Sequence, residues 1–235
     1  MKMNKLFATA VAAFISVSGF AQTVDEIVDK HIAALGGADK LKSVNTMVAE
    51  RSLSVQGMDI PNVSTLIVNK AVRSESTVMG NSMVQAFDGT SAWMIRPTMM
   101  GGTGEPEDMP ADQLKQLKGQ LDPFGPLFNY KEKGNKVELV GTEKVDKKDN
   151  YHLKVTTAGG DVLDQYIDAA TYLITKTKTS ANGQDVEISF SDYKDVDGIK
   201  IAYTMDIANQ MGNLAFITNK IKFNSSVDEK VFKKP

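Results

Sequence analysis

The segment VEISFSDYKDVDGIKIAYTMDI, residues 186–207, is the part of the chain that most clearly indicates the fold. Apolar side chains occupy every second position from Val186 to Phe190, and again from Ile199 to Ile207. A period of two is that of a β-strand with one apolar face. Asp197-Gly198 lies between the two runs, and Asp-Gly is a strong hairpin-turn dipeptide. The segment therefore predicts two antiparallel strands that bury one face.

The same pattern continues through most of the chain and predicts a sheet of about eleven or twelve strands, joined mainly as hairpins. Two regions depart from it. Thr23-Val-Asp-Glu26 has the spacing of a capping box, and apolar residues at helical intervals follow it until Gly36-Gly37. Residues 97–135 interrupt the strands and include a predicted helix over Ala111–Lys118 and a short apolar element over Asp122–Phe128. A curled sheet of this size leaves an interior too wide for its own side chains, so we expect both regions to plug it.

The N-terminus has the features of a secretory signal peptide. A basic start precedes an apolar run over Leu6–Val17, which is too short to span a bilayer, and small residues precede a cleavage site after Ala21. We expect residues 1–21 to be removed and residues 22–235 to form one domain in an exported compartment. The chain has no cysteine, hence no disulfide and no site for N-terminal lipidation. Loss of the two signal-peptide lysines takes the formal charge from −2 to −4, without a basic block, so nucleic acid is not an expected partner.

Residues suited to catalysis are few. The chain has two histidines: His31 at the edge of the helical apolar stripe and His152 on the polar side of a strand. No metalloprotease, phosphate-loop or dinucleotide-binding motif is present. We expect no enzymatic activity, no cofactor and no metal site.

The stretch AWMIRPTMMGG, residues 92–102, has three alternative interpretations. It holds the single tryptophan, and it lies among seven methionines between Met58 and Met109. Thioether sulfurs could bind Cu(I), methionines could fill an irregular core, or they could form an adaptable surface for an apolar ligand. The absence of nearby histidine and cysteine weighs against the metal. We favour the ligand surface over the core.

Several motifs resemble those of the outer-membrane lipoprotein-sorting (LolA/LolB-like) superfamily of periplasmic proteins. They are Ala33-Ala-Leu-Gly-Gly37, Phe87-Asp-Gly-Thr-Ser-Ala-Trp93, Leu121-Asp-Pro-Phe124, Phe190-Ser-Asp-Tyr-Lys-Asp-Val-Asp-Gly-Ile-Lys200 and Val227-Asp-Glu-Lys-Val-Phe-Lys-Lys-Pro235. The resemblance covers essentially the whole mature chain. It implies a mainly β fold: an unclosed antiparallel β-barrel of about eleven strands, whose apolar cavity is covered by the N-terminal helix and a helical insertion, here residues 97–135.

The resemblance also implies a function. It is that of a periplasmic carrier that shields the acyl chains of lipoproteins, or another hydrophobic ligand, and has an envelope protein as a possible partner. The missing lipidation cysteine favours the carrier over a lipid-anchored receptor. A scaffold that docks on an envelope protein without lipid cargo is the alternative. We expect the following residues to line or cover the apolar pocket: Trp93, Ile95, Met99, Met100, Leu114, Leu117, Phe124 and Phe128.

Overall fold

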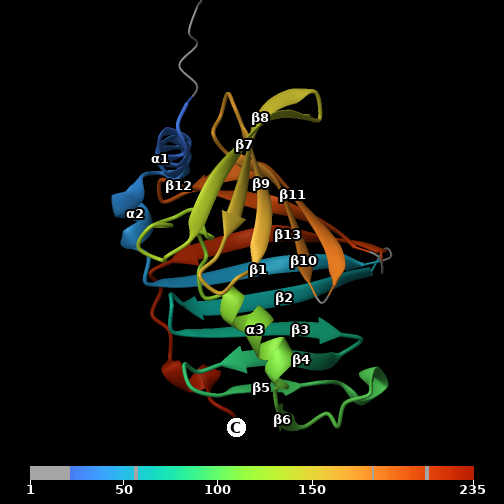
Figure 1. Ribbon diagram of the computed structural model, residues 1–235. Helices are drawn as coiled ribbons and strands as arrows, with labels where there is room; N and C mark the ends of the chain where they lie inside the picture. Colours follow the sequence, from blue (N-terminus) through green and yellow to red (C-terminus); the bar gives the residue numbers. More distant parts are fainter. Residues whose placement is uncertain (1–21, 56–57, 182, 210–211) are drawn as a thin grey trace, which may run out of the picture.

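The computed structural model describes residues 22–55, 58–181, 183–209 and 212–235. The predicted signal peptide, residues 1–21, lies outside the described residues, as do residues 56–57, 182 and 210–211. The described residues form one antiparallel sheet of thirteen strands (Figure 1). The strands are β1 (Thr46–Val55), β2 (Met58–Ile67), β3 (Ala71–Val78), β4 (Asn81–Phe87), β5 (Ala92–Ile95), β6 (Pro106–Asp108), β7 (Lys136–Val145), β8 (Lys148–Thr156), β9 (Val162–Asp168), β10 (Ile174–Ala181), β11 (Gln184–Val196), β12 (Ile199–Asn209) and β13 (Gly212–Phe223).

The sheet is a meander with one long-range join. Its order is β6-β5-β4-β3-β2-β1-β13-β12-β11-β10-β9-β8-β7, so the first and last strands of the chain pair in the middle. β6 and β7 are the two edges, and the sheet is not closed into a barrel. The predicted fold class, an unclosed antiparallel barrel with few helices, is confirmed. The predicted strand count was slightly low, because short β6 lies within the 97–135 interruption.

The hairpin of residues 186–207 forms as predicted. Glu187 to Val196 of β11 pairs with Ile199 to Ala208 of β12, and Asp197 and Gly198 make the turn with positive φ values of 54° and 79°. Two consecutive residues with positive φ are what a tight hairpin turn needs to follow the twist of its strands. The Gly198 amide donates a hydrogen bond of 2.8 Å to Asp195 Oδ1 and fixes the turn.

The helices are few and short. They are α1 (Val24–Leu35), α2 (Ala38–Lys42), α3 (Ala111–Gly119) and the 3-10 turns η1 (Thr98–Met100) and η2 (Glu229–Phe232). The predicted capping box is present, since Thr23 accepts from the Glu26 amide and Glu26 accepts from the Thr23 amide. The same helix buries Ile27, Val28 and Leu35, as its apolar spacing predicts.

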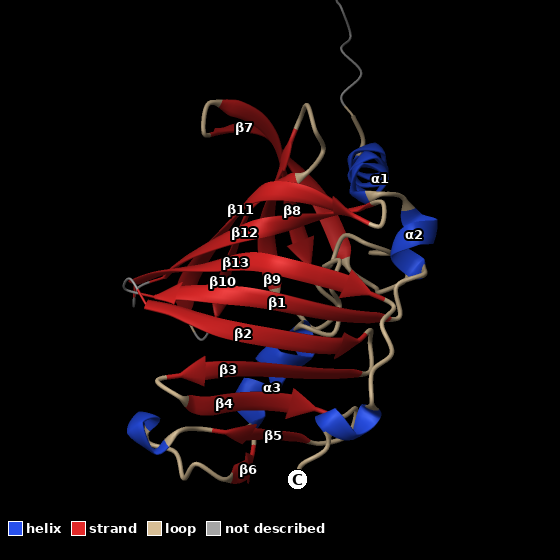
Figure 2. Cartoon of the chain, turned by 180° about the vertical axis from the view of Figure 1, so that it is seen from behind, coloured by secondary structure: helices blue, strands red, loops and turns tan. Residues whose placement is uncertain are grey.

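We use "inner face" for the side of the sheet on which α1, α3 and the segment 120–135 pack. Figure 1 shows α3 in front of the strands β2 to β5, and Figure 2 shows it behind them from the other side. Three buried clusters hold these parts to the inner face. α3 packs on β1 to β4 and β13, α1 packs on β8 and β9, and α2 packs with residues 124–128 near the start of β12.

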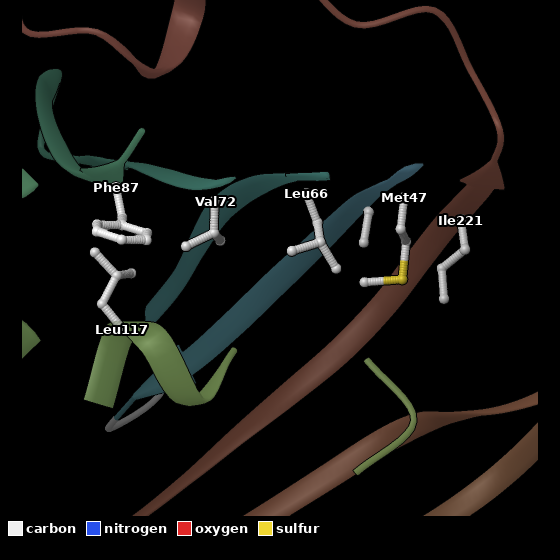
Figure 3. Packing of buried hydrophobic residues seen from close by; sticks show 7 residues of the cluster. Met47, Leu66, Val72, Phe87, Leu117 and Ile221 are labelled. Atoms are coloured by element: carbon white, nitrogen blue, oxygen red, sulfur yellow. The ribbon is translucent and has the colours of Figure 1, made fainter. Parts of the chain in front are cut away.

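The cluster beneath α3 is a row of cross-strand neighbours. Phe87, Val72, Leu66 and Met47 are successive register partners on β4, β3, β2 and β1. Figure 3 shows them in line, with Leu117 of α3 against Phe87 and Ile221 of β13 beyond Met47. All are buried, and each such side chain contributes about 1.5–3 kcal/mol through removal from water. This row fixes α3 on one part of the inner face.

Candidate ligand-binding face

A second row of apolar side chains crosses the inner face farther along the same strands. Because side chains alternate along a strand, Leu53 points to the same face as Met47. Leu53 pairs with Ile60 of β2 and with Phe216 of β13, Phe216 pairs with Met205 of β12, and Met205 pairs with Phe190 of β11. Every member of this row is only half-buried. The row is therefore continuous over five strands and uncovered, unlike the row under Leu117.

A third row runs parallel to it and has the same character. Leu214 pairs with Ile207, and Ile207 pairs with Ile188. All three are half-buried. We call these two rows together the apolar strip: Ile60, Leu53, Phe216, Met205, Phe190, Leu214, Ile207 and Ile188. Monomeric proteins rarely expose a contiguous apolar surface of this kind to water. Such a surface marks a site of association with an apolar partner.

A band of polar side chains separates the apolar strip from the row beneath α3. Asn62 Nδ2 lies 2.9 Å from Ser74 Oγ and 2.9 Å from Ser76 Oγ. On β1, Arg51 Nη1 donates to Ser64 Oγ at 2.9 Å. Burial lowers the pKa of the Arg51 guanidinium, with no opposing effect from a carboxylate. We call Arg51, Asn62, Ser64, Ser74 and Ser76 the polar band.

Two of the site residues predicted from the sequence belong to α3, which packs on the inner face. Leu117 is buried against Phe87, and Leu114 is half-buried against the same cluster. They hold the helix on the sheet. Their apolar surface is used in packing, and a role in covering a ligand stays a prediction.

Phe124 and Phe128 also serve to attach the insertion. Their rings pack edge to face with centroids 5.7 Å apart, and both are buried with Leu35, Leu41 and Val44. Aromatic pairs of this geometry contribute about 0.5–1.5 kcal/mol beyond burial. The segment 120–135 is thereby fixed to the end of α1 and to α2.

Trp93 and Ile95 lie on the opposite face of the sheet. Trp93 pairs with Ala86, and the two pack with Val84 and Ile95. The indole Nε1 donates a 2.7 Å hydrogen bond to the carbonyl oxygen of Phe232, so η2 covers this cluster; the C-terminus lies beside β5 in Figure 2. The structure does not bring Trp93 and Ile95 together with Leu114 and Leu117.

Met99 and Met100 lie apart from both groups. They are 54% and 51% exposed on η1, near the β3–β4 turn, where Asn81 Nδ2 is 3.8 Å from Met99 Sδ. The loop that follows does not cover the inner face, because its residues 106–108 join the sheet as β6. The eight predicted residues are thus divided among α3, the segment 120–135, the outer face and an exposed end of the sheet.

The position of Trp93 leads to a fluorescence prediction. Because Trp93 and the apolar strip lie on opposite faces, we expect Trp93 emission to stay unchanged when a fatty acid binds. Phe232→Ala removes the buried side chain of the residue whose carbonyl accepts from the indole, and we expect a red shift in this variant as η2 loosens. Steady-state emission spectra measure both. Phe124→Ala is the control, since it removes a buried aromatic ring far from Trp93, and a ligand-induced shift in the wild type would contradict this assignment.

The histidines have structural surroundings. Burial lowers the pKa of His31, and its Nδ1 lies 2.8 Å from the Tyr172 carbonyl oxygen. His152 on the outer face lies between Glu143 and Asp164, with nitrogen-to-oxygen distances of 2.6 and 2.8 Å. Within residues 22–55, 58–181, 183–209 and 212–235, no group of three or more acidic, histidine or cysteine side chains is arranged to hold a metal ion.

The surface has two hollows, of which one lies away from the apolar strip and the other lies at its end. One, of about 420 Å³, is between α1 and residues 127–132 and is lined by Asp25, Asp29, Lys131 and Glu132 together with apolar residues. The other, of about 410 Å³, is at the end of the β12–β13 hairpin and carries both Ile207 and Leu214 and the carboxylates of Glu187 and Asp206. Their charged linings suit an apolar chain less well than the strip does.

Comparisons place the fold among known structures. No protein-family model matches the chain, and no curated protein matches it in sequence. A domain from Vibrio parahaemolyticus that is named for outer-membrane lipoprotein sorting superposes with a TM-score of 0.59 at 16% identity, over 89% of this chain and 95% of that one. A LolA superfamily protein from Nitrosomonas europaea gives 0.58 at 14% identity, over 91% and 99%. A DUF1329 family protein from Desulfovibrio piger gives 0.54 at 12% identity, over 89% and 97%.

In the part of the chain that the structure describes, no helix is both long and apolar enough to cross a membrane. The similarity to the three structures extends over nearly the full length of each. The resemblance found in the sequence motifs is confirmed at the level of architecture: the chain has the fold of LolA-superfamily and outer-membrane lipoprotein-sorting domains.

Proposed function

We propose that this protein is a periplasmic carrier of the outer-membrane lipoprotein-sorting type, which binds acyl chains of lipoproteins or another hydrophobic ligand on the apolar strip. The observation that carries the proposal is the strip itself: eight apolar residues on the inner face, contiguous by register and only half-buried. The fold agrees with it, and the predicted signal peptide supplies the route to the periplasm.

The energetics suit a carrier. Burial of an acyl chain contributes about 0.8 kcal/mol per CH₂, so one long chain supplies roughly 10 kcal/mol before the costs of ordering are subtracted. A carrier must also release its ligand. The strip is open to solvent along much of its length and is not sealed in the core, so a ligand can leave without unfolding the sheet.

A scaffold that docks on an envelope protein is the second candidate. Its support is a set of exposed methionines, since Met79, Met99 and Met100 are 71%, 54% and 51% exposed, and methionine adapts to varied partners. Native mass spectrometry of the protein purified from its own envelope separates the two. Copurified lipid supports the carrier, whereas a bare protein with a stable protein partner supports the scaffold.

A pair of isoleucines on adjacent strands provides a direct test of the strip. Ile207 lies in the strip, while Ile217 is 44% exposed, and its register partner is Thr204 of the opposite face. We expect Ile207→Asp to weaken the binding of a fluorescent fatty acid at least tenfold, because a carboxylate beside an acyl chain loses hydration. Ile217→Asp should change it by less than about twofold. Titration of lipid-free protein measures both, and equal affinities would remove the strip as the site.

A further inference from the structure

Arg51 carries a charge for which the described part of the fold provides no counter-ion. Its Nη1 donates to the Ser64 hydroxyl, and its Nε is enclosed without a hydrogen-bond partner. Among the described side chains, no carboxylate lies within 4.0 Å of the guanidinium. The other two arginines, Arg73 of the outer face and Arg96 just after β5, differ in this respect. Arg73 pairs with Glu75 at 2.5 Å and Arg96 pairs with Glu107 at 2.7 Å.

The strand register places this charge on the inner face. β1 pairs with β2 without interruption from Thr46 to Val55, so Arg51 points to the same side as Ala49 and Leu53. Both of those neighbours are apolar, and an apolar residue at this position would pack without cost. Burying arginine N–H donors that lack a hydrogen-bond acceptor costs free energy, and an acceptor that bonds to them removes that cost. The other members of the polar band do not have this need, because Asn62 is bonded to Ser74 and Ser76.

Arg51 is also next to the apolar strip. Leu53 is two residues farther along β1, and the register partner of Arg51 on β2, Asn62, is two residues from Ile60. Two residues along a strand correspond to roughly 7 Å. From the strand position of Arg51, on the side away from Ser64, the inner face therefore continues directly as apolar surface. From Ile60 to Phe190 the strip crosses four interstrand spacings, roughly 19 Å, which suits an extended long-chain acyl group.

We propose that Arg51 binds the anionic head group of a single-headed amphiphile whose acyl chain lies on the apolar strip. The guanidinium is a planar fork of five donors, of which one is used by Ser64, and it matches a carboxylate or phosphate with two parallel hydrogen bonds. The Ser64 hydroxyl accepts from Arg51 and keeps its own proton to donate. This inference rests on the proposed function, and it specifies the ligand class as anionic rather than neutral.

The test compares head groups on one chain length. Lipid-free wild-type protein is titrated with laurate, dodecyl phosphate and dodecanol, and each competes with Nile red, a neutral fluorescent dye. We expect at least one of the two anions to bind at least tenfold more tightly than dodecanol. The preferred anion identifies the head group as carboxylate or phosphate.

Two arginine variants test whether the preference for an anionic head group over dodecanol depends on Arg51. In Arg51→Gln we expect laurate and dodecyl phosphate to weaken to the affinity of dodecanol, while dodecanol itself is unchanged. Arg73→Gln on the outer face is the matched control and should retain the preference, because Arg73 is paired with Glu75. Circular dichroism confirms that each variant is folded.

The outcomes separate this inference from the proposed function. Equal binding of the anions and dodecanol by the wild type overturns the role of Arg51 and leaves the carrier intact. Binding of none of the three overturns both. A preference that persists in Arg51→Gln also overturns the assignment. If that variant does not fold, the wild-type preference and its loss at high salt, which weakens charge pairing, decide the matter.

Discussion

Replacing Gly36 with alanine is expected to lower the free energy of unfolding by roughly 3–5 kcal/mol. Gly36 ends α1 with φ at +129°, a conformation that a residue with a Cβ rarely adopts. An added Cβ would lie 2.3 Å from the carbonyl oxygen of Gly198 in the β11–β12 turn. The atoms that the Cβ would meet are all backbone atoms, which cannot rotate away as a side chain can, so α1 would have to move away from the sheet.

Gly37→Ala is the matched control. Gly37 also has a positive φ, at +93°, but a Cβ there meets no atom within 4 Å. We expect this variant to lower the free energy of unfolding by the conformational strain alone, about 1–2 kcal/mol. Urea denaturation followed by circular dichroism measures both variants. Equal losses would mean that the close approach of Gly36 to Gly198 does not restrict α1.

This contact shows what the sequence could and could not predict about the fold. Gly36-Gly37 was predicted to end a helix and Asp197-Gly198 to form a turn, and both predictions are confirmed. Each rests on local backbone chemistry that the chain carries on its own. That the two glycine sites touch depends on the path of the whole sheet, including the pairing of β1 with β13, and no periodicity contains that information.

The candidate site was harder to predict for the same reason. Alternation from Ile199 to Ile207 showed which residues share a face, but not that Met205 and Ile207 stay uncovered while Ile199 is buried. In β5 both Trp93 and Met94 are buried, so its pattern gives no indication of which side faces the helices.

Arg51 is the functional candidate that the sequence reasoning missed, although a signal was present. Met47, Ala49 and Leu53 are apolar at a period of two, and Arg51 is a charged residue in that register. A single charge on an otherwise apolar strand face indicates either an edge of the core or a ligand site. Only the three-dimensional structure shows that it is enclosed without a carboxylate from the described side chains.

Leu117→Asp is expected to release α3 from the inner face and leave the sheet folded. Leu117 is one of the most deeply buried side chains, and it packs on the row of Phe87, Val72 and Leu66. Loss of a buried leucine costs about 2–5 kcal/mol, and enclosing a carboxylate adds to it. The Lys115–Asp161 ion pair that also holds α3 is exposed and contributes at most about 1 kcal/mol. The local stability of the helix therefore depends on Leu117.

Hydrogen exchange measures this release residue by residue. With a loss of at least about 3 kcal/mol, amides of residues 111–119 should exchange roughly a hundredfold faster, whereas amides of β8 and β9, which pack on α1, should be unchanged. Ala111→Asp places a carboxylate at an exposed position in the first turn of the same helix and should leave exchange nearly as in the wild type. If the β8 and β9 amides accelerate together with α3, the helix is part of the cooperative core and cannot move independently. If α3 alone responds, it is the element that can swing away from the inner face to admit a bulky ligand, and its attachment at Leu117 sets the free-energy cost of that opening.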